Sequence, residues 1–177
     1  VGSGLFGNNT VAGGLIYFDE PNALLFDTSM TPLHMDEVTS VAFDNNGDLW
    51  LANGDLFTMM TIAKYQENSN SWTVYDTSNS ILQNEPYGRI EKIIFDSNNN
   101  LWAGGIYSQG LIKFDGSTWT NYSITNSGLS SNGITDIAFD NQGTMWISTQ
   151  EGLSKFDGAN WTVYNAANSG LPVDWIY

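Results

Sequence analysis

The sequence predicts an all-β protein, a β-propeller segment of about four blades with four antiparallel strands each. Three observations predict this fold. One unit recurs at intervals of 44 to 52 residues, short segments alternate apolar and polar residues with a period of two, and turns rich in Asn, Asp and Gly separate these segments. Four short strands in a repeat of about 40 to 50 residues is the pattern of a propeller blade.

The first half of the unit occurs three times. Residues 38–44, 90–96 and 134–140 read VTSVAFD, IEKIIFD and ITDIAFD, and each is followed by a polar turn and a tryptophan. These tryptophans, Trp50, Trp102 and Trp146, are 52 and 44 residues apart. We therefore expect the first strand of each blade at the repeated segment and the second strand at the tryptophan.

The second half of the unit is clearest in the last two copies. Residues 113–122 and 155–164 read KFDGSTWTNY and KFDGANWTVY, and residues 64–75 form a looser copy. We expect the third and fourth strands there. In the last unit, the predicted strands cover residues 134–140, 144–150, 153–157 and 160–165.

The repeats divide the chain, which we read as one propeller segment over residues 1–177, into four blades. The predicted blades are residues 1–37, 38–89, 90–133 and 134–177. The first blade lacks its first strand, and residues 173–177 stand where a fifth first strand would begin. Three constructions follow: a closed four-bladed ring, part of a six- to eight-bladed propeller, or a homodimer that builds an eight-bladed ring. We favour the larger propeller.

Charge and composition exclude several functions. Nineteen acidic residues and five basic residues give a formal net charge of −14, which repels the phosphates of nucleic acids and anionic membrane surfaces. No stretch has the 18 or so apolar residues of a membrane-spanning helix, so we expect no membrane insertion. The absence of cysteine removes disulfides and thiolate chemistry. We expect no cofactor and no metal.

One run of residues resembles a known family. Phe114-Asp115-Gly116, the segment NSGL at 126–129, and MWIST at 145–149 with the Gly-Leu pair at 152–153 are similar to the two-component regulator propeller repeat. The resemblance spans essentially the whole chain and is strongest in the last two units. It implies a bacterial, extracytoplasmic propeller, either the periplasmic sensor part of a hybrid histidine kinase or a cell-surface or secreted module.

Two repeated motifs have competing interpretations. The Asp/Asn-rich segments at 44–48 and 96–100 suggest calcium ligands, but the same residues are what a hairpin turn with positive φ requires, and we predict turns. Trp50, Trp102 and Trp146 could form a sugar-stacking ladder. Their identical position in every blade favours packing between neighbouring blades. Trp72, Trp119 and Trp161, on the fourth strands, are expected to be partly exposed and mainly structural.

The candidate ligand-binding site lies on one face of the disc. The connection between the second and third strands is enlarged at residues 53–61 and 104–110, compared with 150–152 in the last unit. Strand alternation places these loops on the same face as the connections between blades, which we call the loop-bearing face, and propeller sites are expected on such loops. The candidate ligand-binding residues are Asp55, Phe57, Arg89, Tyr107, Gln109 and Glu151.

The predicted function is non-catalytic binding of a glycan, peptide or protein through the loop-bearing face, as a sensor or surface module. Further blades of the same chain, or a second copy, are other possible partners. One alternative is a propeller lyase or hydrolase acting on polysaccharide, with acid and base drawn from Asp55, Glu151 or the single histidine, His34. A purely architectural spacer is the other alternative.

Overall fold

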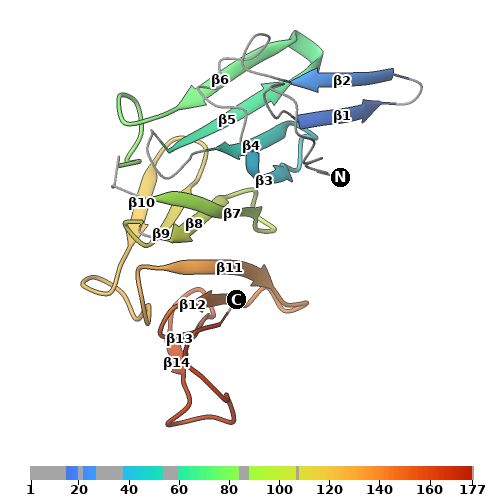
Figure 1. Ribbon diagram of the computed structural model, residues 1–177. Coiled ribbons are helices and arrows are strands. Elements are labelled where there is room, and N and C mark those ends of the chain that lie inside the picture. The colour runs from blue at the N-terminus through green and yellow to red at the C-terminus, as the bar shows by residue number, and fades with distance from the viewer. Residues whose placement is uncertain are drawn as a thin grey trace, which may run out of the picture.

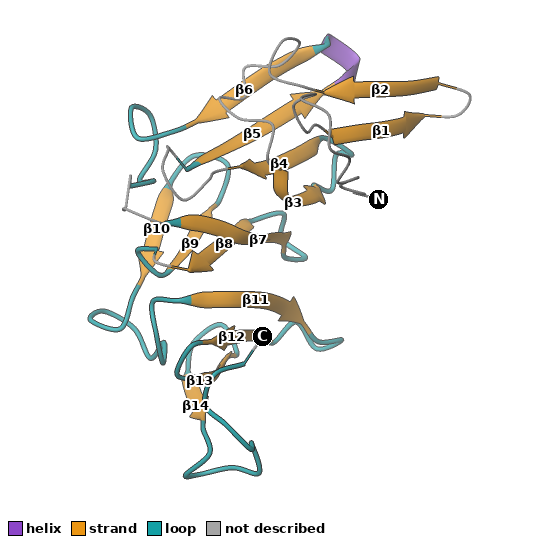
Figure 2. Ribbon diagram, in the orientation of Figure 1, coloured by secondary structure: helices purple, strands orange, loops and turns teal. Residues whose placement is uncertain are grey.

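The protein is described by a computed structural model over residues 15–19, 22–26, 38–53, 60–83, 88–106 and 108–176. These residues form three four-stranded antiparallel sheets, one two-stranded hairpin and one short 3-10 helix, Glu67–Ser69. Figure 2 shows strands and their connecting loops almost everywhere else. Within these residues no helix has the length and apolarity to cross a membrane. The predicted all-β propeller fold is confirmed.

Each four-stranded sheet is a blade whose strands follow one another in chain order. The first contains β3 (Val38–Phe43), β4 (Leu49–Asn53), β5 (Thr61–Gln66) and β6 (Ser71–Tyr75). The second contains β7 (Arg89–Phe95), β8 (Leu101–Ile106), β9 (Leu111–Phe114) and β10 (Trp119–Tyr122). The third contains β11 (Ile134–Phe139), β12 (Met145–Thr149), β13 (Gly152–Phe156) and β14 (Trp161–Tyr164). All four strands predicted for the last unit are found, each end within one residue.

The N-terminal hairpin has the register of a third and fourth strand. It consists of β1 (Leu15–Asp19) and β2 (Asn22–Phe26), and Leu15 pairs with Phe26. Leu111 pairs with Tyr122 in the same way, and Leu153 with Tyr164. Residues 1–14 lie outside the described residues, and the predicted blade boundaries stay a prediction.

The blades follow one another in space as they do in sequence. Figure 1 shows the β1–β2 hairpin at one end of the series and β11–β14 at the other. These two ends lie apart, so the described residues form no closed four-bladed ring. The backbone of Ile176 instead bonds to the last blade itself, through Thr149 and Thr135.

An aspartate at the turn between the first two strands of each blade binds the indole of the next tryptophan. The Asp44 carboxylate accepts hydrogen bonds from the backbone amides of Asn46 (2.8 Å) and Asp48 (3.0 Å), and from Trp50 Nε1 (3.1 Å). Gly47 in this turn has a φ of 83°. The predicted turn is therefore confirmed, and its carboxylate is used to hold the turn and the indole.

The same contact recurs in the other two blades. Asp96 accepts from Trp102 Nε1 at 2.9 Å, and Asp140 accepts from Trp146 Nε1 at 3.1 Å. We call the three pairs the Asp–Trp clasps. A buried indole N–H needs an acceptor, and an ionised carboxylate is a strong one. Each clasp thus satisfies the only polar group of an indole that is buried, at Trp50 and Trp102, or half-buried, at Trp146.

A lysine and a tyrosine enclose each clasped indole. The Nζ atoms of Lys64, Lys113 and Lys155 lie 5.4, 5.4 and 5.2 Å from the ring centroids of their tryptophans. Tyr75, Tyr122 and Tyr164, at the ends of the fourth strands, lie 5.7, 5.7 and 5.9 Å from the same indoles in stacked orientation. Cation–π and stacked aromatic contacts each contribute about 0.5–1.5 kcal/mol.

The clasped tryptophans pack between blades. Trp50 is 4% exposed and lies 5.5 Å from Phe95 and 6.3 Å from Phe114 of the next sheet. Trp102, also 4% exposed, lies 6.4 Å from Phe156 of the sheet after it. The predicted packing role is confirmed for both residues, and their buried faces are unavailable to a sugar.

The fourth-strand tryptophans are half-buried, as predicted. Trp119 stacks on Phe114 at 4.3 Å, and Trp161 stacks on Phe156 at 4.5 Å. Trp119 and Trp161 each cover the phenylalanine of their own blade that packs against the clasped tryptophan of the preceding blade. The outer strands therefore complete the interface between blades.

The clasps lower the pKa values of their carboxyl groups. Burial alone would raise the pKa of Asp44 and Asp96, but hydrogen bonds from the indole and the turn outweigh it and hold both below the ordinary value of 3.8. At Asp140 the hydrogen bond from Trp146 is the largest cause of a lowered pKa. The ionised form is thus favoured in the folded protein at all three positions.

Replacing a clasp aspartate should destabilise the fold. Asp96→Ala removes the acceptor for Trp102 Nε1, for two turn amides and for the Asn100 side chain. We expect the free energy of unfolding to fall by about 2 kcal/mol, measured by urea denaturation, because partly buried donors lose their partner. Glu151→Ala, at an exposed turn, is the control and should change it by less than about 0.5 kcal/mol. Equal effects of the two variants would contradict the clasp.

Stability should also fall in acid. A carboxyl group whose pKa is lower in the folded state stabilises the protein fully above its unfolded pKa, near 3.8, and loses this contribution as the pH falls through the folded value. We expect a lower urea midpoint at pH 3 than at pH 5. Asp96→Asn should show a smaller drop over this interval. A wild-type midpoint that is the same at pH 3 and pH 5 would overturn the assignment.

Candidate ligand-binding face

The first strands of the blades gather on the inner side of the propeller. Strands β3, β7 and β11 are edge strands of their sheets, and neighbouring ones pack against each other. The backbone amide of Ile93 donates to Ser40 Oγ at 3.0 Å across one junction, and Lys92 Nζ lies 3.2 Å from Asp136 Oδ1 across the next. Ser40, Lys92 and Asp136 occupy equivalent positions of the repeat, so one polar side chain per blade lies at this inner position.

Two glycines on β8 allow close contacts, one with the next blade and one within the same blade. A Cβ on Gly104 would lie 2.8 Å from the side chain of Ile134 in the next blade, and a Cβ on Gly105 would collide with the backbone oxygen of Arg89. The register of β7 and β8 shifts between Ile90 and Lys92, beside Glu91. The bulge and the two glycines together position Arg89 and Glu91 at the start of the inner strand.

The basic residues of the chain fall into two groups. Lys64, Lys113 and Lys155 lie over indoles, as described above. The other two, Arg89 and Lys92, are both on β7. The chain has a net charge of −14, and the positive charges that do not lie over an indole are both on one inner strand.

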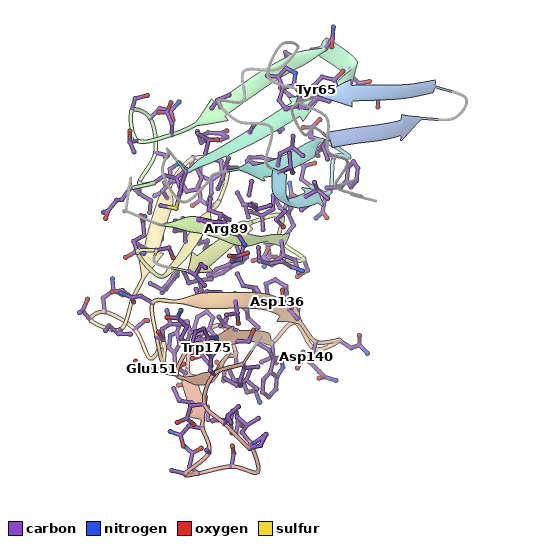
Figure 3. All side chains as sticks on the ribbon, in the orientation of Figure 1. Tyr65, Arg89, Asp136, Asp140, Glu151 and Trp175 are labelled. Atoms are coloured by element: carbon purple, nitrogen blue, oxygen red, sulfur yellow. The ribbon has the colours of Figure 1, made fainter. Side chains whose placement is uncertain are left out.

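Both of these cations are paired with carboxylates. Arg89 Nε and Nη2 donate to the two carboxylate oxygens of Glu91 at 2.8 and 3.0 Å, which is a bidentate arrangement. The side chains remain 31% and 20% exposed, and those of Lys92 and Asp136 are 36% and 52% exposed. Figure 3 shows Arg89 on β7 and Asp136 on the neighbouring β11. We call Arg89, Glu91, Lys92 and Asp136 the inner charged cluster.

The side chain of Gln109 links the loop before β9 to the connection between β6 and β7. Its Nε2 donates to the backbone oxygen of Ile81 at 2.6 Å, and its Oε1 accepts from the backbone amide of Gln83 at 3.0 Å. Both partners belong to the connection that arrives from the preceding blade. The amide therefore positions this connection, and the predicted ligand-binding role of Gln109 stays a prediction.

Hydroxyl groups make the equivalent link at the next junction. Ser130 Oγ lies 2.9 Å from Thr149 Oγ1 and 2.8 Å from Ser154 Oγ, and the backbone amide of Ser130 donates to Ser154 at 3.0 Å. The connection between blades is thus bound to the next β-hairpin at both junctions. These bonds attach residues 81–83 and Ser130 to the hairpins of the blades that follow them.

The structure separates the predicted site residues. Glu151 is exposed in the turn between β12 and β13, and Figure 3 places it well away from Arg89. Arg89 lies on the inner strand, and Gln109 on the loop before β9. Asp55, Phe57, Tyr107 and His34 lie outside the described residues. Sequence reasoning missed Glu91, Lys92 and Asp136, although two of them stand at the same position of aligned repeats.

Fold and repeated contacts together define the class of this protein. It is a β-propeller segment with clasped tryptophans between blades. Residues 128–151 match the family described as two component regulator propeller, so the resemblance stated from the sequence is confirmed. No curated protein gives a significant match.

Two solved structures share this fold. The extracellular domain assigned to a hybrid two component system of B. thetaiotaomicron has 21% sequence identity and a TM-score of 0.70, with 93% of this chain and 22% of that chain covered. The extracellular domain assigned to a one component system of the same organism has 14% identity and a TM-score of 0.66, at the same coverage. This chain therefore spans about a fifth of the length of these two solved chains.

Removing the Gln109 amide should loosen the junction between the first two described blades. In Gln109→Ala the amide of Gln83 and the oxygen of Ile81 lose their partner. We expect hydrogen exchange at residues 81–83 to accelerate about tenfold and the unfolding free energy to fall by about 1 kcal/mol. Gln142→Ala, in the exposed turn before β12, is the matched control and should leave both unchanged. Unchanged exchange in Gln109→Ala would refute the linking role.

Proposed function

We propose that this chain is part of a non-catalytic, extracytoplasmic propeller that binds a neutral glycan or a peptide at the inner charged cluster, on the side of the loop-bearing face. The observation that carries the proposal is the pairing of Arg89 with Glu91 and of Lys92 with Asp136 on adjacent inner strands. Partly exposed pairs of this kind present hydrogen-bond donors and acceptors side by side, which suits the hydroxyl pairs of a sugar or the amides of a peptide.

The overall charge supports this ligand class. A net charge of −14 disfavours polyanions, and each cation of the cluster is neutralised by a neighbouring carboxylate. A ligand without excess negative charge pays no electrostatic penalty on approach. The similarity to two extracellular domains of sensor systems supports a location outside the cytoplasm.

The packing and hydrogen bonding of the scaffold support a binding role. The packed aromatic residues are occupied in the blade interfaces, and the connections at the loop-bearing face are fixed by Gln109 and Ser130. Binding residues on a rigid scaffold lose little conformational freedom when a ligand arrives. Of the acid–base candidates for an enzyme, Glu151 alone lies in the described part of the chain.

Binding can be tested on a microarray of neutral oligosaccharides and a library of short peptides, followed by calorimetric titration of the best ligand. We expect one probe class to bind, and Lys92→Gln and Arg89→Gln each to weaken it about tenfold or more, because a charged hydrogen-bond donor is lost. Glu67→Gln, exposed in the 3-10 helix, is the control and should bind normally. Binding that both site variants retain at wild-type affinity would place the site elsewhere.

A further inference from the structure

Two described junctions show how one blade docks on the next. After β6 the chain buries Leu82, 3% exposed, before Ile90, 2% exposed, begins the core of β7. After β10 it buries Leu129, 5% exposed, before Ile134, 0% exposed, at the start of β11. A leucine of the connection and an isoleucine of the next inner strand therefore fill each junction.

Aromatic residues complete both junctions. Tyr75 lies 5.3 Å from Phe114 and 5.4 Å from Trp119, and thus contacts the third and fourth strands of the following blade. At the next junction Tyr122 lies 6.2 Å from Phe156 and 6.1 Å from Trp161. The receiving face is a clasped tryptophan with its tyrosine, and the arriving blade presents a phenylalanine and a tryptophan.

The last blade carries a third receiving face. Trp146 and Tyr164 stack on each other as in the other blades. The connection after β14 contains Leu171 and Ile176. These two residues are five positions apart, as are Leu129 and Ile134. The amide of Ile176 donates to the oxygen of Thr149 at 3.1 Å, and Thr135 Oγ1 donates to the oxygen of Ile176 at 2.6 Å.

This third face is incompletely covered. Trp146 and Leu171 are half-buried, whereas their equivalents at the other junctions are at most 5% exposed. Val173 is 57% exposed and Trp175 is 49% exposed, and these two are among the four exposed large hydrophobic residues of the described chain. Trp146 and Leu171 are thus more exposed than their equivalents at both other junctions, and with Val173 and Trp175 they mark an apolar surface for a partner.

We propose that Trp146, Tyr164, Leu171 and residues 173–176 form the docking surface for a further blade of the same repeat, continuous with this chain. Residues 173–176 begin its inner strand, its third strand presents a phenylalanine, and its fourth strand a tryptophan. A continuous blade is favoured over a second copy because the inner-strand position is already occupied by this chain's own residues, bonded to Thr149 and Thr135.

The proposal can be tested by extending the chain in register. A second copy of residues 135–176 is joined after Ile176, which takes the place of Ile134. We expect the urea midpoint to rise and amide exchange in β12 and β14 to slow at least tenfold, because neighbouring repeats stabilise each other. The matched control has the same extension with Phe156→Ser and Trp161→Ser in the appended copy alone, and it should show neither effect.

The variant Trp175→Ser distinguishes stabilisation through this surface from a general effect of chain length. It should change the midpoint of the unextended protein little and lower that of the extended protein clearly. An appended blade that folds without protecting β12 would overturn the proposal. An appended blade that stays unfolded beside a native remainder would do the same, since a docking surface should template it. A concentration-dependent dimer of the unextended chain that Trp175→Ser abolishes would assign the surface to a second copy.

Discussion

The clasped tryptophan on the second strand is the constraint on which the rest of the structure depends. Its flat ring fills the space between two sheets, but its N–H needs an acceptor there. The aspartate six residues earlier supplies the acceptor and also closes the turn between the two strands. One residue therefore fixes the turn, the direction of the second strand and the orientation of the ring against the next blade. Lysine and tyrosine from the third and fourth strands then pack on this ring, so that every strand of a blade takes part in the same interface.

This arrangement limits where a ligand can bind. Trp50 and Trp102 are used between blades, and three of the five basic residues are held over indoles. In the function that we propose, recognition depends on polar groups that take no part in the clasps. On the described residues these gather at the inner strands, where Gly104 lets the next blade approach, Gly105 makes room for the Arg89 backbone within its own blade, and the inner charged cluster forms. The residues that build the clasps and those of the proposed binding site are thus separate sets.

The candidate site was less predictable than the fold. Loop insertions indicated the loop-bearing face, but Gln109 proved to hold a backbone connection, and Met60, at the end of the first insertion, is buried in the core at 1% exposure. An insertion in the sequence does not distinguish a loop that packs from one that binds. The Lys92–Asp136 pair could have been inferred only by assuming that equivalent inner positions of adjacent blades meet, and a sequence contains no distance between blades.

The sequence by itself determined the class of fold, the strands and the turns, because each blade repeats local patterns: alternation of two, a turn with positive φ, and a tryptophan at fixed distance from an aspartate. It also established the excess of acidic residues. The tertiary structure alone decided that Asp44, Asp96 and Asp140 bind indoles, that the cations left over lie on one inner strand, and that Trp146 carries a half-covered copy of a buried interface. These features depend on contacts between residues of different strands and different blades. Local propensity fixes each strand, whereas the meeting of Lys92 with Asp136 exists only once the sheets have packed.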